Sequence, residues 1–558
     1  MNARAAALTA AIAAVAAVSC APPGAGGASG EPAPTPGGST RATDRVVIPA
    51  MTTITAIGVG DRYTFIATPG GLGIYDHRFN QWHPPVTRVD GWPDATVTLM
   101  LADPADPAAI WFAADNMVFH YRVGFDEIVR TLVPDRVNAF FVDPADIAGG
   151  VIVGSSTGYL RVSAAGGVQP YVQAPGAARP PTTGGSQRIF PQTVASVYKQ
   201  YPALQGYERL ITRDAQLRSW PVISAAATPG VSEVWLGTAG GGLFKADPLF
   251  FRGESVPFGL IGDGTGAVAR AADGVWFGSL GGTAASRGGV TFVDAEFRTW
   301  RWLDGGTASP LANARITSLV QSGTTLWIGS DRGLVHLDAQ TGGVLRRVDD
   351  MGASSVALAL EVADGGVWVG TTRGLSFIPD SETSRSRNDV QTALLNTTVR
   401  ALVMRSDTLW IASDLGLFAL PRGESQPRRV RSAASDTRVN TAVTAIATVD
   451  SIVVIANAEG EVVRISARSG QVLDPVSLVN TSRVGRVYGL AADANTIWIA
   501  GERGVLISQR AANTQRFLAN GPDLPGEAFG LVLTPRYAWI ATRGGGVRVR
   551  RADDGMVR

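Results

Sequence analysis

The sequence repeats one short pattern along most of its length, and the clearest copy is residues 326–338, which read LWIGSDRGLVHLD. An apolar run of strand length leads into a polar turn that ends at Gly333, a residue type that tolerates positive φ, and a second apolar run follows. This order predicts a β-hairpin. The first run is apolar at successive positions, so we expect other sheets to cover both of its faces.

The copies can be aligned on the position of Trp327, which we call the anchor. Most successive anchors are 41 to 46 residues apart, and the exceptions are gaps of 51 and 83 residues. A period of this size is typical of the four-stranded blades of a β-propeller. We expect the anchors to fill the space between blades, the tryptophans among them being structural residues. The eleven anchors are Phe65, Trp111, Ile152, Trp235, Trp276, Trp327, Trp368, Trp410, Val454, Trp498 and Trp539.

Two further positions recur at fixed distances from the anchor. Two residues after it every copy has Gly or Ala, such as Gly329, and six residues after it nearly every copy has Gly, such as Gly333. The first position shares a strand face with the anchor, so a neighbouring sheet is expected to approach too closely there for a larger side chain. The second position fixes the length of the turn.

The fold class predicted from these repeats is all-β, with about 11–12 four-stranded blades that form two propellers in tandem. We place the N-terminal blades in residues 44–230, with an insertion near 175–215, and the C-terminal blades in residues 231–558. Residues 174–220 lack a clear copy, so they hold either a degenerate twelfth blade or an insertion. The apolar segment 45–48 is a candidate to complete the last blade.

The N-terminus has the pattern of an export signal. Arg4 precedes an apolar run at 5–18, and small residues lead to Cys20, the only cysteine in the chain. This resembles a bacterial lipoprotein signal with its lipobox, although Ala17 stands where such signals more often have Leu. The resemblance implies a signal peptide at 1–20, lipidation of Cys20, and a location in the cell envelope, periplasmic or at the outer membrane. An ordinary secretory signal and a single membrane anchor are the alternatives.

Residues 21–43 are rich in Pro, Gly, Ala and Ser, which is typical of a flexible tether. The chain as a whole has a formal net charge of +2 and no basic run, so we expect no nucleic-acid partner. Its four histidines have no metal-ligand spacing, and no catalytic motif is present. We therefore predict no metal, no cofactor and no catalytic residues.

Arginines recur at two places in the predicted blades: beside the turn glycine and at the start of the first strand. In a propeller both kinds of loop emerge on one face around the channel mouth, where the arginines would form a loose positive ring. Such a ring suits an anionic or polyhydroxylated ligand. The alternative is that turns need polar residues and this chain, with only two lysines, supplies arginine. The candidate ligand-binding residues are Arg136, Arg315, Arg332, Arg373, Arg400, Arg438, Arg486, Arg503 and Arg543.

One family resemblance covers about residues 50–550. The segment 367–375, VWVGTTRGL, is similar to the two-component regulator propeller repeat, which forms periplasmic sensor domains. The resemblance implies a propeller that binds ligands, often carbohydrate fragments. A second segment, 334–345, is similar to repeats of the outer-membrane assembly lipoprotein propeller and of quinoprotein dehydrogenases.

Together these patterns predict a non-catalytic, lipid-anchored envelope protein. It would bind a glycan or another anionic ligand, or a protein partner, through the face around the channel mouth. Two alternatives remain: an envelope assembly scaffold of the outer-membrane assembly lipoprotein type, and a propeller lyase or glycoside-active enzyme. The enzyme would need His, Tyr or carboxylate side chains that converge at one channel mouth.

Overall fold

The computed structural model describes residues 44–557 apart from residue 126 and the segments 144–149, 172–187, 215–216, 282–286, 305–309, 352–353, 381–393, 432–437, 474–480 and 510–513. Cys20, the predicted signal peptide and the predicted tether therefore lie outside the described residues. In the described part the fold is all-β, with eleven antiparallel sheets of three or four strands and two short α-helices. This confirms the all-β class and the small antiparallel sheets that were predicted. None of the helices described is both long and apolar enough to cross a membrane.

The first four complete sheets along the chain, which we call the N-terminal sheets, each contain four strands. Their strands are β2 (Ala56–Val59), β3 (Tyr63–Thr68), β4 (Gly71–Asp76) and β5 (Gln81–Trp82); β6 (Leu99–Ala102), β7 (Ala109–Ala114), β8 (Met117–Arg122) and β9 (Ile128–Leu132); β10 (Ala139–Phe141), β11 (Val151–Ser155), β12 (Gly158–Val162) and β13 (Val168–Pro170); and β14 (Val222–Ala227), β15 (Val234–Thr238), β16 (Leu243–Asp247) and β17 (Arg252–Val256).

Seven further sheets, the C-terminal sheets, follow. Their strands are β18 (Thr265–Arg270), β19 (Gly274–Ser279), β20 (Val290–Asp294) and β21 (Trp300–Leu303); β22 (Ile316–Ser322), β23 (Thr325–Ser330), β24 (Gly333–Asp338) and β25 (Val344–Val348); β26 (Ala357–Ala363), β27 (Gly366–Thr371) and β28 (Gly374–Pro379); β29 (Val399–Arg405), β30 (Thr408–Ser413), β31 (Gly416–Pro421) and β32 (Arg428–Arg429); β33 (Val443–Val449), β34 (Ile452–Asn457) and β35 (Val462–Ser466); β36 (Val487–Ala492), β37 (Thr496–Gly501), β38 (Gly504–Gln509) and β39 (Gln515–Ala519); and β40 (Ala528–Leu533), β41 (Tyr537–Thr542), β42 (Gly545–Arg550) and β1 (Arg45–Ile48).

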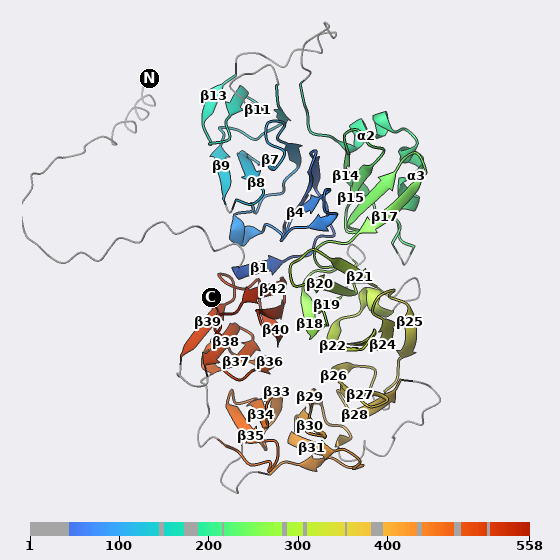
Figure 1. The fold of residues 1–558 in the computed structure, drawn as a ribbon, viewed down its shortest axis with the longest axis vertical. Coiled ribbons are helices and arrows are strands. Elements are labelled where there is room, and N and C mark those ends of the chain that lie inside the picture. The colour runs from blue at the N-terminus through green and yellow to red at the C-terminus, as the bar shows by residue number, and fades with distance from the viewer. Residues whose placement is uncertain are drawn as a thin grey trace, which may run out of the picture. The chain divides into compact units, whose positions relative to one another are not determined.

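The first strands of the C-terminal sheets contact one another in a complete cycle. In chain order β18, β22, β26, β29, β33, β36 and β40 are each in contact with the next, and β40 is also in contact with β18. Figure 1 shows these seven sheets around a common centre. The first strand of each of these sheets is therefore the innermost one.

Among the described residues, the first strands of the N-terminal sheets contact one another in a series that does not close into a cycle. β2 contacts both β14 and β6, so the sheet of β14 to β17 lies beside that of β2 to β5. The helices α2 (Val194–Gln200) and α3 (Leu204–Ile211) cover the other side of β14 to β17, where Val197, Leu204 and Ile211 pack on Ala225 and Phe244. Among the described residues of the segment 174–220, these helices stand where a twelfth blade was considered. They give the end sheet of the series the apolar cover that a further blade would provide.

The chain's first strand, β1, completes the last sheet. It pairs antiparallel with β42, with Arg45 opposite Val549 and Ile48 opposite Gly546. This agrees with the expectation that the apolar segment 45–48 completes the last repeat of the chain. The same strand also joins the two groups of sheets, because Val46 and Ile48 belong to a core cluster that contains Ile57 and Trp82 from the N-terminal sheets and Phe277 from the C-terminal ones.

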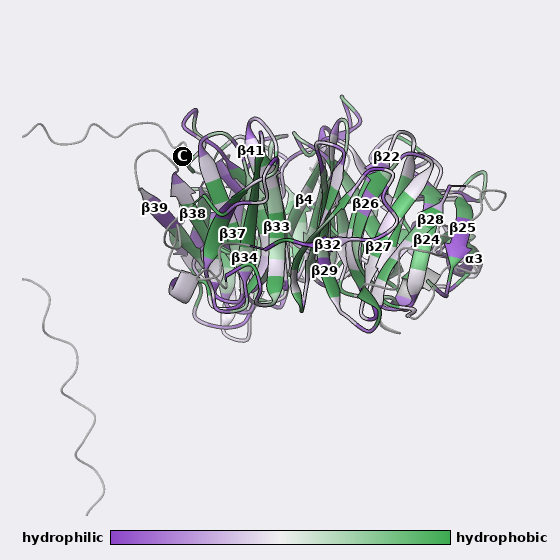
Figure 2. Cartoon of the chain, turned by 90° about the horizontal axis from the view of Figure 1, so that it is seen from below, coloured by the Kyte–Doolittle hydropathy of each residue, from purple (hydrophilic) through white to green (hydrophobic). Residues whose placement is uncertain are grey.

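The anchors behave as the repeat predicted. All eleven lie in the second strand of a sheet, and the least buried of them, Trp368, is 5% exposed. The turn after this strand is glycine-dependent in most copies; Gly333, for example, has a φ of 128°. Figure 2, which is coloured by hydropathy, shows that the centres of the strands are apolar and that the turns at both faces are polar.

The small residue two positions after the anchor is needed because of the next sheet. A Cβ atom added to Gly329 would lie 2.3 Å from Ser318 Oγ of its own sheet and 3.0 Å from Ala357 Cβ of the next one. The same holds for Gly278, whose added Cβ would lie 2.3 Å from Ile316 Cγ2. The predicted close approach between sheets is therefore present.

We expect Gly329→Val to lower the free energy of unfolding by about 1–3 kcal/mol, because the added methyl groups overpack this contact. Thermal denaturation measures the effect. Gly530→Ala is the matched control, since an added Cβ there has its nearest neighbour, Val268 Cγ1, at 4.0 Å. Equal melting temperatures for Gly329→Val and the parent would contradict the alignment of the sheets.

Candidate functional site

The turns between second and third strands and the loops that enter the first strands lie at the same end of each sheet, because all neighbouring strands are antiparallel. We call this side of the C-terminal sheets the mouth face; its turns include residues 331–332, 414–415, 502–503 and 543–544. We call the opposite side, with the first-to-second and third-to-fourth strand turns, the tether face. All the predicted ligand-binding arginines of the C-terminal sheets are on the mouth face.

A β-bulge recurs where each first strand leaves the mouth face. In all seven C-terminal sheets the pairing of the first and second strands shifts register at the same point, and one residue of the first strand is left without a partner in the ladder. Bulges of this kind redirect a side chain and are frequent beside functional sites. The extra residues are Gly266, Thr317, Leu358, Arg400, Thr444, Tyr488 and Phe529.

Two of the bulged residues form an aromatic pair. The rings of Tyr488 in β36 and Phe529 in β40 have centroids 5.6 Å apart and planes tilted by 45°. Both side chains are half-buried, so part of each ring is accessible to solvent. Their strands approach closely, since a Cβ atom added to Gly489 would lie 3.1 Å from the Cα atom of Gly530. The small residues after each bulge therefore bring the rings together.

Two predicted arginines meet at this pair. The guanidinium carbon of Arg315 lies 5.7 Å from the centroid of the Phe529 ring, and that of Arg543 lies 5.5 Å from it. Both distances are within the range of cation–π attraction. Arg543 is also bonded to Glu527, with Nη2 and Oε2 2.6 Å apart. We call Arg315, Tyr488, Phe529 and Arg543 the mouth cluster.

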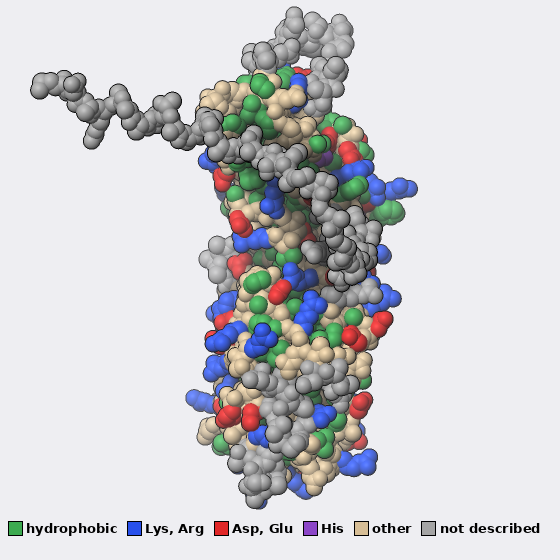
Figure 3. Space-filling model, turned by 90° about the vertical axis from the view of Figure 1, so that its left-hand side faces the viewer, with side chains coloured by type: hydrophobic (Ala, Val, Ile, Leu, Met, Phe, Trp, Pro, Cys, Tyr) green, Lys and Arg blue, Asp and Glu red, His purple; other side chains and the backbone are tan. Residues whose placement is uncertain are grey.

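The other predicted arginines are distributed around the face, and their described contacts are local. Arg400 forms an ion pair with Asp414, with Nε and Oδ1 2.6 Å apart. The backbone amides of Arg332 and Arg373 donate to Ser330 and Thr371, each over 3.1 Å. Carboxylates therefore share this face with the arginines. Acidic and basic side chains are also interspersed on the edge of the molecule that Figure 3 shows.

Three more of the predicted arginines also contact their own part of the chain. The amide of Arg486 donates to Glu502 Oε2 over 3.5 Å, the amide of Arg503 donates to the Val484 carbonyl over 2.8 Å, and the Arg438 carbonyl accepts from Thr441 Oγ1 over 3.3 Å. Arg136 precedes β10 and so belongs to the N-terminal sheets. The structure thus brings two of the nine predicted arginines, Arg315 and Arg543, to a single ring.

The aromatic half of the mouth cluster was not predicted from the sequence. Tyr488 and Phe529 lie in the largely apolar strands β36 and β40, among residues that also suit a core. A signal for them exists, because each bulged residue of the C-terminal sheets comes ten positions before its anchor. Six of these seven residues have a side chain beyond Cα, whereas the position two residues after the anchor is always Gly or Ala, so the two patterns differ clearly once aligned.

A carboxyl group lies half-buried in one of the innermost strands. Glu361 in β26 lies opposite the anchor Trp368, and its Oε1 atom accepts a hydrogen bond of 3.0 Å from the amide of Met404 in β29. Burial raises the pKa of Glu361 to about 7. The equivalent residues of the other six C-terminal sheets are all Ala or Val: Ala269, Val320, Val403, Ala447, Ala491 and Val532.

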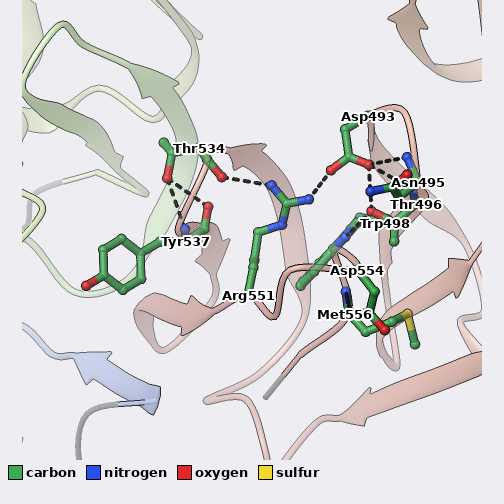
Figure 4. Close-up of polar contacts among 9 residues, drawn as sticks. All are labelled: Asp493, Asn495, Thr496, Trp498, Thr534, Tyr537, Arg551, Asp554 and Met556. Carbon is green, nitrogen blue, oxygen red and sulfur yellow. Dashed lines mark hydrogen bonds and ion pairs between the residues drawn. The ribbon is translucent and has the colours of Figure 1, made fainter.

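A cavity of about 720 Å³ opens on the tether face beside the C-terminus, and Asp493, Tyr537 and Arg551 are among its lining residues. Figure 4 shows that both terminal nitrogens of its central arginine are engaged: Arg551 pairs with Asp493 and donates to the Thr534 carbonyl over 2.8 Å. Asp493 also accepts from the amide of Thr496 over 2.8 Å. These bonds hold the C-terminal segment on the neighbouring sheet, so we interpret this cluster as a structural clasp.

Three of the four histidines, His77, His120 and His336, contact neighbouring side chains. His120 lies 3.1 Å from Asp103 Oδ2, which also accepts from the indole of Trp111 over 2.9 Å, and His77 is 2.8 Å from Thr64 Oγ1. His336 stacks on Trp327, with ring centroids 3.9 Å apart. Among the described residues, no three His, Cys, Asp or Glu side chains form a group that could hold a metal ion.

No protein-family model and no curated protein matches this sequence. Among solved structures, the extracellular domain described for a one-component system, BT4673 of B. thetaiotaomicron, covers 90% of this chain and 76% of its own at 13% identity, with a TM-score of 0.41. A second structure of that domain, described as part of a hybrid two-component system, covers 89% and 69% at 13% identity, with a TM-score of 0.40. The computationally designed protein Ika8 covers 52% and 99% at 16% identity, with a TM-score of 0.38. Similarities at this level support no conclusion about function.

Proposed function

We propose that this chain is a non-catalytic binding protein of the bacterial cell envelope, held by a lipid on Cys20, that binds a glycan or a protein partner through its mouth face. The observation that carries the proposal is the mouth cluster, in which two residues of a recurring backbone bulge, Tyr488 and Phe529, pack together and two arginines lie beside Phe529. Aromatic and arginine side chains are the residue types that contribute most to binding sites. Here they are gathered on one face and remain accessible.

The proposed architecture is two propellers in tandem. The C-terminal one is a ring of seven blades, in which the contact between β40 and β18 closes the cycle and β1 supplies the last strand. The N-terminal one is an open arc of four blades that ends at α2 and α3. Residue 230 lies between β14 and β15 of a single sheet, so we place the boundary between the propellers after β17, in residues 257–264.

The mouth cluster favours a ligand that has both an apolar face and a negative charge. Tyr488 and Phe529 offer ring surface on which the C–H face of a sugar or an apolar side chain can pack. Arg315 and Arg543 offer guanidinium groups that bind carboxylates through paired hydrogen bonds. An acidic oligosaccharide combines these features, and oligogalacturonate is a suitable probe.

Replacing both Tyr488 and Arg315 with alanine should weaken the binding of oligogalacturonate at least about tenfold, because a stacking surface and a cation are lost together. Isothermal titration calorimetry measures the affinity. Arg400→Ala with Arg486→Ala should also reduce binding while leaving the fold intact, if the wider arginine ring contributes. The matched control is Tyr207→Ala, which removes a tyrosine that is 43% exposed on α3, away from the mouth face.

Cellohexaose, a neutral oligosaccharide, separates the role of charge from that of stacking. It should bind more weakly than oligogalacturonate and should respond to Tyr488→Ala more than to Arg315→Ala. Binding of oligogalacturonate that is equal in the double variant and the parent would contradict the proposal. Lipidation is tested separately, by mass spectrometry of the mature N-terminal peptide that begins at Cys20.

A further inference from the structure

Exposed apolar side chains gather at the turns between the third and fourth strands of the N-terminal sheets. Phe79 follows β4 and is 57% exposed, and Phe125 follows β8 and is 55% exposed. After β16 three large apolar residues stand in succession, of which Leu249 is 66% and Phe250 69% exposed. We call residues 79, 125 and 249–251 the apolar tips. Three of the four N-terminal sheets therefore present an apolar tip to solvent.

The largest tip is held in its exposed position by its backbone. The side chain of Asp247 accepts hydrogen bonds from the amides of Leu249 and Phe250, over 2.9 and 3.3 Å. Phe251 has a φ of 52°, a left-handed conformation that is uncommon for an aromatic residue, and its ring packs on Tyr207 at 4.5 Å. Strain of this kind persists where the surroundings fix it, often at functional positions. The tip is thus a built feature and not a loose loop.

An arginine accompanies every tip. The guanidinium carbon of Arg78 lies 5.5 Å from the ring centroid of Phe79, and that of Arg122 lies 4.8 Å from that of Phe125. Arg252 directly follows Phe251. Arg122 is paired with Asp106 over 2.6 Å, whereas for Arg78 and Arg252 no ion pair is formed with the described residues. An apolar ring beside an available guanidinium is the combination that suits the boundary between lipid tails and phosphate headgroups.

The tips all lie on the tether face. Third-to-fourth strand turns share one end of antiparallel sheets, and the two groups of sheets have the same orientation, because the amide of Trp82 donates to the carbonyl of Arg298 where the corresponding turns meet. Strand β1 also begins on this face: Arg45 pairs with Val549, and Asp44 lies 3.7 Å from Arg550. The described body therefore begins, at Asp44, on the side that carries the tips.

We infer that the apolar tips place the tether face of the N-terminal sheets on the surface of a lipid bilayer with anionic headgroups. The inference rests on the proposed envelope location, and it adds an orientation to it. A lipid on Cys20 would hold the chain at the membrane without orienting the body, whereas inserted apolar side chains and arginines that meet anionic headgroups fix which face lies on the bilayer. With the tether face on the bilayer, the mouth face points away from the membrane, where a ligand has free access.

Vesicle flotation tests the inference without the lipid anchor. The protein used is residues 40–558, which form one compact unit that retains every described strand and core cluster. It is mixed with vesicles of phosphatidylethanolamine and phosphatidylglycerol, or with neutral phosphatidylcholine vesicles. The tip variant combines Phe79→Ser, Phe125→Ser, Leu249→Ser and Phe250→Ser. The control variant combines Val89→Ser, Leu132→Ser, Leu395→Ser and Leu415→Ser, which are exposed to a similar extent at the loops of the opposite face.

We expect the parent to float with the anionic vesicles. The fraction of the tip variant that floats should be at least about tenfold lower, and that of the control variant should match the parent. Binding to neutral vesicles should be weaker, because the arginines then lack phosphate partners of net negative charge. Failure of the parent to bind anionic vesicles, or an equal loss in both variants, would overturn the inference. So would a parent that forms dimers through the tips and does not float, as judged by analytical ultracentrifugation. Lipidation of Cys20 and oligogalacturonate binding are read out independently of all these results.

Discussion

Trp327→Ala should lower the free energy of unfolding by about 3–5 kcal/mol, the usual cost of removing a large buried aromatic side chain. Trp327 is 1% exposed and packs in a cluster with Leu334, Ala357 and Val367, which come from its own sheet and the next one. Its indole N–H has no hydrogen-bond partner among the described residues, so the loss is one of packing. Thermal or denaturant unfolding measures it.

Leu345→Ala is the matched control, because Leu345 lies in β25 of the same sheet and is 57% exposed. This control should change stability by less than about 0.5 kcal/mol. A Trp327→Ala protein as stable as the control would show that the anchor does not join neighbouring sheets. The contrast between the two variants therefore tests the repeat itself, since both residues are apolar and only one is an anchor.

Glu361→Gln should stabilise the protein above neutral pH and have little effect at low pH. The pKa of Glu361 is raised to about 7 by burial, from an ordinary value of 4.5. A raised pKa means that the folded state favours the protonated carboxyl, so its contribution to stability is complete below about pH 4.5 and is lost as the pH rises through 7. The loss is on the order of 3 kcal/mol at pH 8. Glutamine keeps the acceptor for the Met404 amide without the charge.

Melting temperatures of the parent and Glu361→Gln, compared from pH 4 to pH 8, check this prediction. The two should nearly coincide at pH 4 and separate in favour of the variant as the pH rises. Glu254→Gln, the same change at an exposed glutamate of β17, is the control for the substitution itself. A constant difference between parent and Glu361→Gln across this range would mean that the carboxyl does not titrate between these pH values.

The repeat made most of the fold predictable, for a physical reason. Trp327, Gly329 and Gly333 each satisfy a local demand that recurs in every sheet: filling the gap between sheets, allowing close approach and forming the turn. Demands that recur at a fixed spacing leave a visible period in one sequence. The prediction therefore located all eleven second strands, and it also identified residues 45–48 as the strand that completes the last sheet.

Features that depend on how the sheets contact one another leave no periodic pattern in the sequence. The cycle of seven C-terminal sheets and the cover that α2 and α3 give to the N-terminal ones arise from contacts between sheets, which a repeat does not encode. The mouth cluster is similar. Arg315 and Arg543 were candidates because arginine recurs at their positions, but Phe529 joins them only through the bulge. Glu361 is a single exception among seven equivalent positions, so periodicity hides it.

The pairing of β1 with β42 makes the first and last strands of the body neighbours in one sheet. The chain is synthesised from its N-terminus, so β1 is made hundreds of residues before its partner exists. Until residue 550 has been made, β1 lacks its neighbouring strand, and such an open edge is a template for pairing with other chains. Assembly of the body is therefore bound to finish late, and the nascent chain needs protection from aggregation until its two ends meet.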